Sequence, residues 1–327
     1  MPLALELPVH MQAVALEEMA LLKLLKDMLH DQTQLPADVT LATRNELIEM
    51  AQKHMHPEDL PYFLRCADMQ PTFEDHDGII DFPLPVGLQP CTVAEELAEQ
   101  HLQEGSGSLW NAARMVARTL QFENDPRDIA NGCTFRLGLF CKGGITGLAK
   151  SSTHHVAASR LFNQVVREVA PDHTWTSLSI SVDNGTTPHV DSNNTSETSL
   201  LVGLTHHSAG HLWIQDNSGD TWMEASGVKY LGTTYATARR AVLFNSRLCL
   251  HGTLPWQGTR CVLLAYTVGS RAGVRDDHAR HLEEAGYQLP SGWGKRGHDV
   301  HTTVQRRLEH YFNDTPSRAD AAECWEI

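Results

Sequence analysis

The chain has 327 residues and a formal net charge of −14, so it is long enough to bury a full hydrophobic core in one large or two small domains. No apolar run approaches the length of a membrane span, and the N-terminal segment lacks the basic and apolar regions of a secretory signal. The seven cysteines form no C-x-x-C pair, which argues against a zinc finger and favours a reducing compartment. We therefore expect an intracellular protein that does not cross a membrane.

The negative charge is unevenly distributed along the chain. Residues 1–130 contain 22 acidic and 8 basic side chains, whereas residues 131–327 contain 18 of each. Because an acidic surface repels phosphates, any nucleic acid is expected to contact residues 131–327. This part has no continuous basic stripe. Its candidate phosphate contacts are Arg136, Lys142, Arg239 and Arg240.

The first third of the chain has the pattern of helices. Apolar residues recur with a helical period from Ala13 to Leu29. Capping-box patterns at 43–46 and 92–95 each predict a helix start, and residues 108–122 predict another amphipathic helix. The acidic segment 73–90, which is rich in Pro and Gly, is expected to be a long loop. A solvated connector is favoured there over a substrate lid.

A β-rich region begins near Cys133. Residues 134–140 predict a strand that ends at a Gly-rich turn, 143–147, which lacks the pattern of a phosphate-binding loop. A helix is expected over 153–169, and the tail returns to helix from Asp276, including 300–312. Between these helices, short strands with frequent turns are predicted at 176–182, 199–204, 210–215, 221–225, 230–237, 240–245 and 259–268. Closely spaced short strands are typical of a sandwich or jelly roll.

Three residues in this region have the types and spacing of a metal site. His189 and Asp191 are two positions apart, so on an extended strand their side chains point to the same face. His251, between two strand-like runs, can supply a third ligand. Two imidazoles and one carboxylate leave three open metal positions, a set that suits Fe(II) and oxygen chemistry. Arg260, on the last predicted strand, can grip the far carboxylate of a 2-oxoacid. The alternative is a set of structural histidines that fall in this order by chance.

The order His189-x-Asp191, His251, Arg260 on a helix-flanked jelly roll resembles the Fe(II)/2-oxoglutarate dioxygenase superfamily. A closer resemblance is to the TET/J-base-binding-protein group, which oxidises the methyl of thymine or 5-methylcytosine in nucleic acid. The features that carry it are the H-x-D-x-x-N pattern over 189–194, the apolar strands 201–204 and 209–214, and the runs 241–245, 251–255 and 258–266. The resemblance covers residues 133–268, and the chain lacks the cysteine-rich zinc module of the TET proteins.

This resemblance implies an α+β fold with a double-stranded β-helix (jelly-roll) core. We divide the chain into an acidic helical N-terminal region packed on the core (1–130), the jelly-roll dioxygenase core (131–270) and a helical C-terminal tail (271–327).

The resemblance also implies a reaction and its participants. His189, Asp191 and His251 would hold Fe(II), and Arg260 would bind 2-oxoglutarate, with O₂ as the oxidant and ascorbate as an optional reductant. The expected reaction is hydroxylation of a C–H bond, with the methyl of thymine or 5-methylcytosine in DNA as the first choice of substrate. A target base must leave its stack to reach the iron. Asn194 is the candidate base reader because a carboxamide both donates and accepts hydrogen bonds. A DNA substrate implies a nuclear location.

Two other functions remain open from the sequence. One is an oxygenase of the same superfamily that acts on a small molecule or a protein side chain. The other is a jelly-roll binding module with a degenerate metal site. The oligomeric state is undetermined.

Other histidines and tryptophans are interpreted as structural. The group His206, His207 and His211 is interpreted as polar turn residues, and His154-His155 as the exposed first turn of a helix. Trp213 and Trp222 are interpreted as packing residues.

Overall fold

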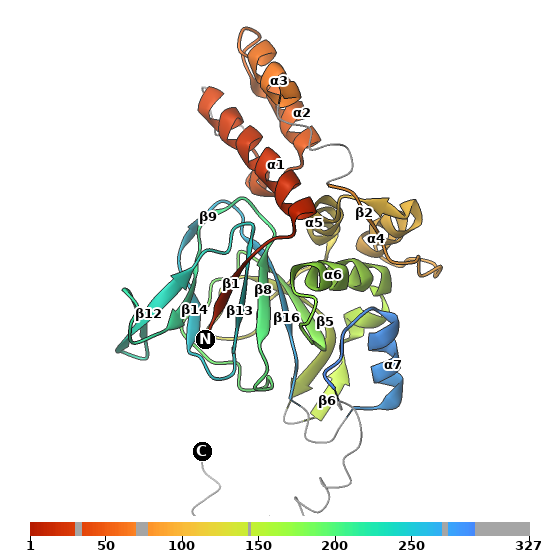
Figure 1. Cartoon of the computed structure of the whole chain (residues 1–327), viewed down its shortest axis with the longest axis vertical. Helices are drawn as coiled ribbons and strands as arrows, with labels where there is room; N and C mark the ends of the chain where they lie inside the picture. Colours follow the sequence, from red (N-terminus) through yellow and green to blue (C-terminus); the bar gives the residue numbers. More distant parts are fainter. Residues whose placement is uncertain (30–34, 70–77, 143–144, 270–273, 292–327) are drawn as a thin grey trace, which may run out of the picture.

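The structure, a computed structural model, describes residues 1–29, 35–69, 78–142, 145–269 and 274–291. Two antiparallel sheets form the centre of the molecule, and helices lie against the larger one (Figure 1). In spatial order the larger sheet contains β1 (Leu3–Glu6), β13 (Arg240–Phe244), β8 (Ser199–Gly203), β16 (Cys261–Tyr266), β7 (Ser177–Val182), β5 (Cys133–Lys142) and β4 (Glu123–Asn124), with β6 (Ile145–Leu148) paired to the end of β5. The smaller sheet contains β11 (Thr221–Ala225), β12 (Val228–Tyr235), β10 (Leu212–Gln215) and β14 (His251–Thr253).

These two sheets make the jelly roll that the strand pattern predicts. The chain alternates between them, so that β8 and β10, and later β14 and β16, lie in opposite sheets. The segment around His189 extends the smaller sheet beyond β14, because His189 and His251 exchange backbone hydrogen bonds of 2.9 Å. The fold is therefore α+β with a jelly-roll core, as expected.

Strand β16 shows why the central strands are apolar on both faces. Val262 packs in the core between the two sheets, together with residues such as Ile214 and Phe244. Its neighbours Cys261 and Leu263 face the other way, into the main core beneath the helices. Side chains of a strand alternate between faces, so a strand covered on both sides needs a nearly continuous apolar run.

Two helix starts depend on the same acidic residue. Helices α4 (Val93–Glu104), α5 (Leu109–Thr119) and α6 (Val156–Val169) contribute to the main core. Thr92 caps α4 as predicted, since its hydroxyl accepts a hydrogen bond from the Glu95 N–H. The Glu95 carboxylate instead accepts hydrogen bonds from the N–H groups of Ala157 and Ala158 at the start of α6 (2.7 and 3.1 Å). One residue thus joins the ends of two helices.

The remaining helices in the first part of the chain form a second core. They are α1 (Val9–Met28), η2 (Val39–Leu41), α2 (Arg44–His54) and α3 (Leu60–Met69). Leu21, Leu25, Leu47 and Phe63 are fully buried among them. The capping box at the start of α2 is present with both reciprocal hydrogen bonds. Figure 1 shows α1–α3 projecting away from the sheets.

The segment before residue 130 also contains strands that its helical pattern does not predict. β1 pairs with β13 and so belongs to the larger sheet. Short strands β2 (Ile80–Asp81) and β3 (Ser106–Gly107) pair with each other, so the predicted loop 73–90 is not wholly irregular. Within that loop, the N–H groups of Val86 and Gly87 donate to the Glu99 carboxylate on α4. The proposed domain boundaries stay a prediction.

After the jelly roll, α7 (Asp276–Glu284) begins where the tail is expected to return to helix. The predicted helix 300–312 lies outside the described residues, as do parts of the segments 73–90 and 143–147. Two smaller features complete the fold: η3 (Lys150–Thr153), and the pair formed by β9 (Ser208–Ala209) and β15 (Trp256–Gln257).

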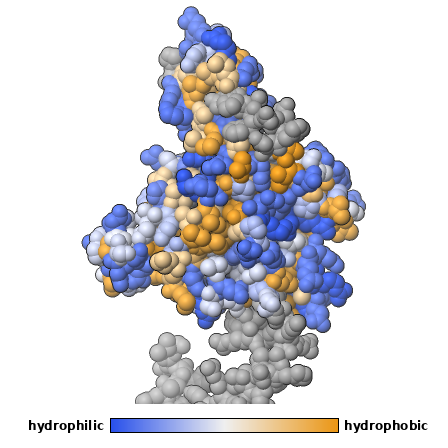
Figure 2. Space-filling model, in the orientation of Figure 1, coloured by the Kyte–Doolittle hydropathy of each residue, from blue (hydrophilic) through white to orange (hydrophobic). Residues whose placement is uncertain are grey.

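The surface carries both hydrophilic and apolar side chains. Figure 2 shows hydrophilic side chains over much of the visible face, with apolar ones gathered near its middle. None of the helices in the described part of the chain combines the length and apolarity that a membrane crossing requires.

Candidate metal centre

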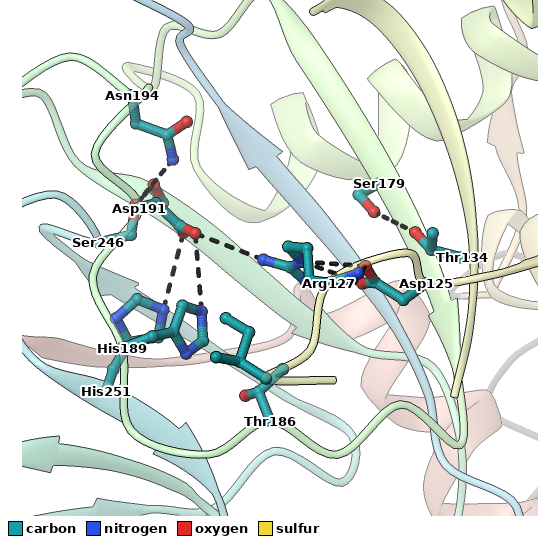
Figure 3. Close-up of polar contacts among 12 residues, drawn as sticks. Asp125, Arg127, Thr134, Ser179, Thr186, His189, Asp191, Asn194, Ser246 and His251 are labelled. Atoms are coloured by element: carbon teal, nitrogen blue, oxygen red, sulfur yellow. Dashed lines mark hydrogen bonds and ion pairs between the residues drawn. The ribbon is translucent and has the colours of Figure 1, made fainter. Parts of the chain in front are cut away.

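Three predicted ligands meet at one end of the jelly roll. The ligand atoms of His189, Asp191 and His251 all lie within 4.8 Å of one another. Nε2 of His189 is 3.6 Å from Asp191 Oδ1, and Nε2 of His251 is 3.7 Å from Asp191 Oδ2 (Figure 3). The backbone bridge between the two histidines brings their rings together, with centroids 4.3 Å apart. Long-range pairing of the smaller sheet therefore assembles the three residues.

The tautomers of both histidines suit metal binding. Nδ1 of His189 is 2.8 Å from the Thr187 carbonyl oxygen, and Nδ1 of His251 is 2.9 Å from that of Cys249. A carbonyl can only accept, so each Nδ1 carries the proton and each Nε2 keeps its lone pair. Burial, followed by the neighbouring His189, lowers the pKa of His251 to about 4. Both effects favour the neutral imidazole that a metal requires.

This donor set fits a ferrous ion. Two neutral imidazoles and one carboxylate on one side of a site form the facial arrangement of non-haem Fe(II) centres, with positions left open for other ligands. A cavity of about 260 Å³ adjoins the triad, and His189 and Asp191 are part of its wall. The open positions would therefore face a space that small molecules can enter.

Arg127 lies in this cavity although the sequence pattern does not single it out. Its Nη1 is 3.6 Å from Asp191 Oδ1, while its Nε and Nη2 donate to the Asp125 carboxylate (Figure 3). Burial opposes ionisation of Asp125, but hydrogen bonds from Arg127 and Asn184 outweigh it and lower the pKa to about 2. Asp125 thus stays charged and holds the guanidinium beside the triad. The only local signal is an acid and a base two positions apart, which is too common to be diagnostic.

Further residues of the cavity come from the larger sheet. Arg136 and Phe140 of β5 and Tyr266 of β16 are part of its wall. Burial raises the pKa of Tyr266, so its phenol is neutral. Arg136, a candidate phosphate contact from the sequence, thus shares a cavity with His189 and Asp191.

Asn194, the predicted base reader, also borders the cavity. Its Nδ2 donates to Ser246 Oγ (2.9 Å), and this hydroxyl is also bonded to Ser199 Oγ (2.8 Å). The Asp191 N–H donates to the Ser246 carbonyl, so Ser246 holds both ends of the segment that follows the carboxylate ligand. Figure 3 shows the Asn194 carbonyl oxygen directed away from Ser246.

Arg260 lies at the other end of β16 and is not part of the wall of this cavity. It is only 2% exposed, and its Nε donates to the Gly210 carbonyl oxygen (3.2 Å). The Asp183 carboxylate accepts from its backbone N–H instead of its guanidinium. Within the described ranges, no carboxylate forms an ion pair with Arg260. Burial lowers the pKa of Arg260 to about 10, which still leaves it charged.

The histidines set aside in the sequence are more buried than expected. His206 and His207 lie in the connection between β8 and β9, as the turn interpretation predicts, but they are 7% and 2% exposed. His206 Nε2 is 3.0 Å from Glu18 Oε2 of α1, and His207 is bonded to the hydroxyls of Thr205 and Thr237. Because His206 and His207 bond to side chains from distant segments, their local pattern could not predict this.

Two other interpretations have mixed outcomes. His155 is buried against Thr92 and Ser151, not exposed, whereas His154 is exposed. Trp213 is fully buried, as expected of a packing residue, while Trp222 is 61% exposed.

Comparisons with known proteins give matches only among solved structures. No protein-family model matches the sequence, and no curated protein matches it. Similar structures include a Pseudomonas putida prolyl-4-hydroxylase (14% identity, 54% of this chain and 89% of that one, TM-score 0.27). A Burkholderia pseudomallei oxidoreductase of the 2OG-Fe(II) oxygenase family matches at 14% identity (57% and 93%, TM-score 0.33). NgTET1 in complex with 5mC DNA matches at 10% identity (72% and 82%, TM-score 0.29).

A prolyl hydroxylase and a TET protein are both among these matches. The assignment of a jelly roll depends on strand order, and the assignment of a metal centre depends on the triad.

Proposed function

We propose that this protein is an Fe(II)- and 2-oxoglutarate-dependent oxygenase that hydroxylates a C–H bond. The observation that carries the proposal is the convergence of His189, Asp191 and His251, with both Nε2 atoms facing the carboxylate. When bound there, iron would supply the oxygen activation that is coupled to oxidative decarboxylation of the co-substrate.

Arg260 supports the identity of the co-substrate. A buried cation without a carboxylate partner is costly, and an anionic ligand would offset that cost. The planar guanidinium can bind a carboxylate through two hydrogen bonds. A 2-oxoacid with a second carboxylate, such as 2-oxoglutarate, has one group for the metal and one for a guanidinium. Arg260 lies outside the wall of the cavity beside the triad, so the Arg260→Ala variant decides whether Arg260 is that guanidinium. In this role Arg260 binds and orients the co-substrate.

The remaining residues would aim the substrate and exclude water. Tyr266 and Arg127 are part of the wall of the cavity beside the triad. Ser246 positions the segment that carries Asp191, and the carbonyl groups of Thr187 and Cys249 keep the imidazoles oriented. Such outer partners of metal ligands typically contribute 10–100-fold to metal affinity or activity.

For the substrate we propose the methyl group of 5-methylcytosine in DNA, with thymine as the second choice. One N–H of the Asn194 amide donates to Ser246, which orients the carboxamide, and its carbonyl oxygen is an acceptor that could read a base. An acceptor suits the amino group of cytosine better than the carbonyl of thymine. The target base would have to be flipped out of its stack. A nuclear location follows for a DNA-modifying enzyme.

The test combines binding and product analysis. Anaerobic titration should give one Fe(II) per chain, and 2-oxoglutarate should be consumed with formation of succinate. Mass spectrometry of 5-methylcytosine DNA after turnover should detect 5-hydroxymethylcytosine. An absence of iron binding would reject the oxygenase proposal. Succinate formation without oxidised bases would reject the nucleobase substrate and leave the oxygenase in place.

A further inference from the structure

Arg127 lies between two carboxylates, and its distances to them are unequal (Figure 3). Its Nη2 donates to Asp125 Oδ2 at 2.7 Å, and its Nε donates to Asp125 Oδ1 at 3.0 Å. The contact with Asp191 joins Nη1 to Oδ1 over 3.6 Å, which is an ion pair but is too long for a hydrogen bond. The guanidinium is therefore bound to Asp125 and only faces the predicted metal ligand.

Asp125 is held in place from several sides. Its side chain is 1% exposed, and its Oδ2 accepts a hydrogen bond from Asn184 Nδ2 (3.0 Å). Its backbone N–H donates to the Gly132 carbonyl oxygen (2.8 Å), and Arg136 Nη2 lies 3.6 Å from its Oδ1. The side chain of Arg127, in contrast, is 40% exposed. Asp125 is thus the fixed partner of this pair, and Arg127 is the partner with room to move.

Backbone hydrogen bonds place this pair beside the segment that carries the ligands. The Ile129 carbonyl oxygen accepts from the Thr187 N–H at 2.9 Å, and Ala130 forms an antiparallel bridge with Thr186. His189, the first histidine of the triad, follows two residues after Thr187. The turn that contains the acid and the arginine is therefore attached to the chain immediately before the metal ligands, which fixes where the guanidinium can reach.

Arg127 and a metal ion would use the same part of Asp191. Asp191 Oδ1 is 3.6 Å from Arg127 Nη1 and also 3.6 Å from His189 Nε2. In the described part of the chain the carboxylates paired with Arg127 are Asp125 and Asp191, so without the first the second would remain as its partner. A guanidinium bound there would occupy the oxygen that a metal needs and would place a positive charge beside it.

We propose that Asp125 is a positioning residue of the metal centre, which binds Arg127 and so prevents this guanidinium from competing with the metal ion for Asp191. The inference rests on the proposed function, because it assumes that the triad holds a divalent metal ion. It concerns the affinity for that ion, and it requires neither co-substrate nor substrate. A different role, in which Arg127 supports Asp191 for metal binding, predicts the opposite effect when Arg127 is removed.

The experiment is a mutant cycle that measures metal affinity in the full chain. The probe is Mn(II), which has the charge of Fe(II) and is stable in air, and the paramagnetic resonance signal of the free ion gives the dissociation constant. The variants are Asp125→Asn, Arg127→Gln and the double variant that combines them. His189→Ala shows whether the ion binds at the triad, and circular dichroism checks the folding of each variant.

The chain offers a matched control in a second acid and base that are two positions apart. Arg275 donates to the Asp277 carboxylate through Nε (2.9 Å) and Nη2 (2.6 Å), as Arg127 does to Asp125. Both residues of this control pair are exposed, and neither is part of the wall of the cavity beside the triad. Asp277→Asn changes the net charge as much as Asp125→Asn does, and it should leave the affinity for Mn(II) unchanged.

If the inference is right, Asp125→Asn weakens Mn(II) binding about 10- to 100-fold, the usual range for an outer partner of a metal ligand. Arg127→Gln should bind at least as tightly as the wild type. The double variant should bind more tightly than Asp125→Asn alone, because no guanidinium remains to compete.

Two results would overturn the inference and leave the metal centre in place: weaker binding by Arg127→Gln, or a double variant that binds no better than Asp125→Asn. The first of these does not depend on the folding of Asp125→Asn. An absence of Mn(II) binding by the wild type, or normal binding by His189→Ala, would instead reject the metal centre itself and this inference with it.

Discussion

Three side chains from two distant segments meet at the candidate metal centre, where their possible ligand atoms lie within 4.8 Å of one another. The i, i+2 spacing of His189 and Asp191 is local, whereas His251 reaches them through pairing of the smaller sheet. The hydrogen bonds at Nδ1 of each histidine keep Nε2 available. At this scale the residues therefore have separable roles, which substitutions can distinguish.

Replacement of His189 or Asp191 by Ala should abolish binding of Fe(II) and leave the fold intact. Both side chains line the cavity and lie outside the apolar core, so their proposed role is that of ligands. Iron stoichiometry after anaerobic reconstitution measures the loss, and circular dichroism checks the fold. His154→Ala, at an exposed histidine, is the control and should bind iron normally. Normal iron content in either ligand variant would show that the triad is not the metal site.

Replacement of Arg260 by Ala should weaken the binding of 2-oxoglutarate by about 2–5 kcal/mol, because a buried charge partner is lost. Lys at this position should restore only part of the affinity, since an ammonium cannot form the planar fork. The apparent KM for 2-oxoglutarate is the measurement. Arg247→Ala provides the comparison, because Arg247 already donates to backbone carbonyls of the segment after Asp191. An unchanged KM in Arg260→Ala with a raised KM in Arg247→Ala would move the anchor to Arg247.

At the level of elements, a single side chain can connect two helices that the sequence pattern predicts independently. Thr92 and Glu95 look like a capping box of one helix, yet the Glu95 carboxylate caps α6. Its position at a helix N-terminus is electrostatically favourable, since the first N–H groups of a helix lack partners within it. Burial is the largest effect on Glu95 and raises its pKa.

Replacement of Glu95 by Ala should lower the free energy of unfolding by about 1–3 kcal/mol, because two buried N–H groups lose their acceptor. Glu96→Ala is the matched control. Glu96 lies next to Glu95 in the same helical turn but is exposed, so its loss should change stability by less than about 0.5 kcal/mol. Urea unfolding measures both values. Equal effects in the two variants would mean that the carboxylate does not join α4 to α6.

At the scale of the whole molecule, a buried polar cluster links the N-terminal helices to the jelly roll. Arg114 and Glu18 form a fully buried ion pair, and Trp110 and His206 also bond to the Glu18 carboxylate. Both ring nitrogens of the next residue, His207, are hydrogen-bonded to hydroxyl groups, those of Thr205 and Thr237. Burial lowers the pKa of His206 to about 4, and burial followed by Arg260 lowers that of His207 to about 3.

Because of this cluster, we expect the free energy of unfolding to fall as the pH is lowered. The ordinary pKa of 6.5 lies above the folded values, so the unfolded chain binds more protons as the pH falls. The neutral histidines contribute full stability above about pH 6.5, and this contribution is lost as the pH falls toward 4 and then 3. Between pH 7 and pH 5 each histidine should lose roughly 2 kcal/mol of this contribution, because pH 5 lies about 1.5 units below the unfolded pKa. His207→Gln should reduce the difference between the free energies of unfolding that urea titrations give at pH 7 and at pH 5. His154→Gln should not, because that ring is exposed. An equal pH dependence in wild type and His207→Gln would contradict the prediction.

Local patterns in the sequence were sufficient for most elements and for pairing His189 with Asp191, although only an isolated bridge at His189, not a strand, forms there. The capping box at Thr43, the strands β7, β8, β10 to β13 and β16, and the i, i+2 relation of His189 and Asp191 all depend on neighbours within a few positions. The order of strands and ligands also indicated the jelly roll.

Tertiary structure alone decided which distant groups share a cavity or a core. It placed β1 in the larger sheet, brought Arg127 to the triad, directed Glu95 to α6 and buried His206 against Glu18. It also separated Arg136 from Arg240 by placing their strands toward opposite sides of the larger sheet. None of these outcomes follows from local periodicity, because each depends on pairing and packing between segments that are far apart in the chain, where propensity and spacing carry no information.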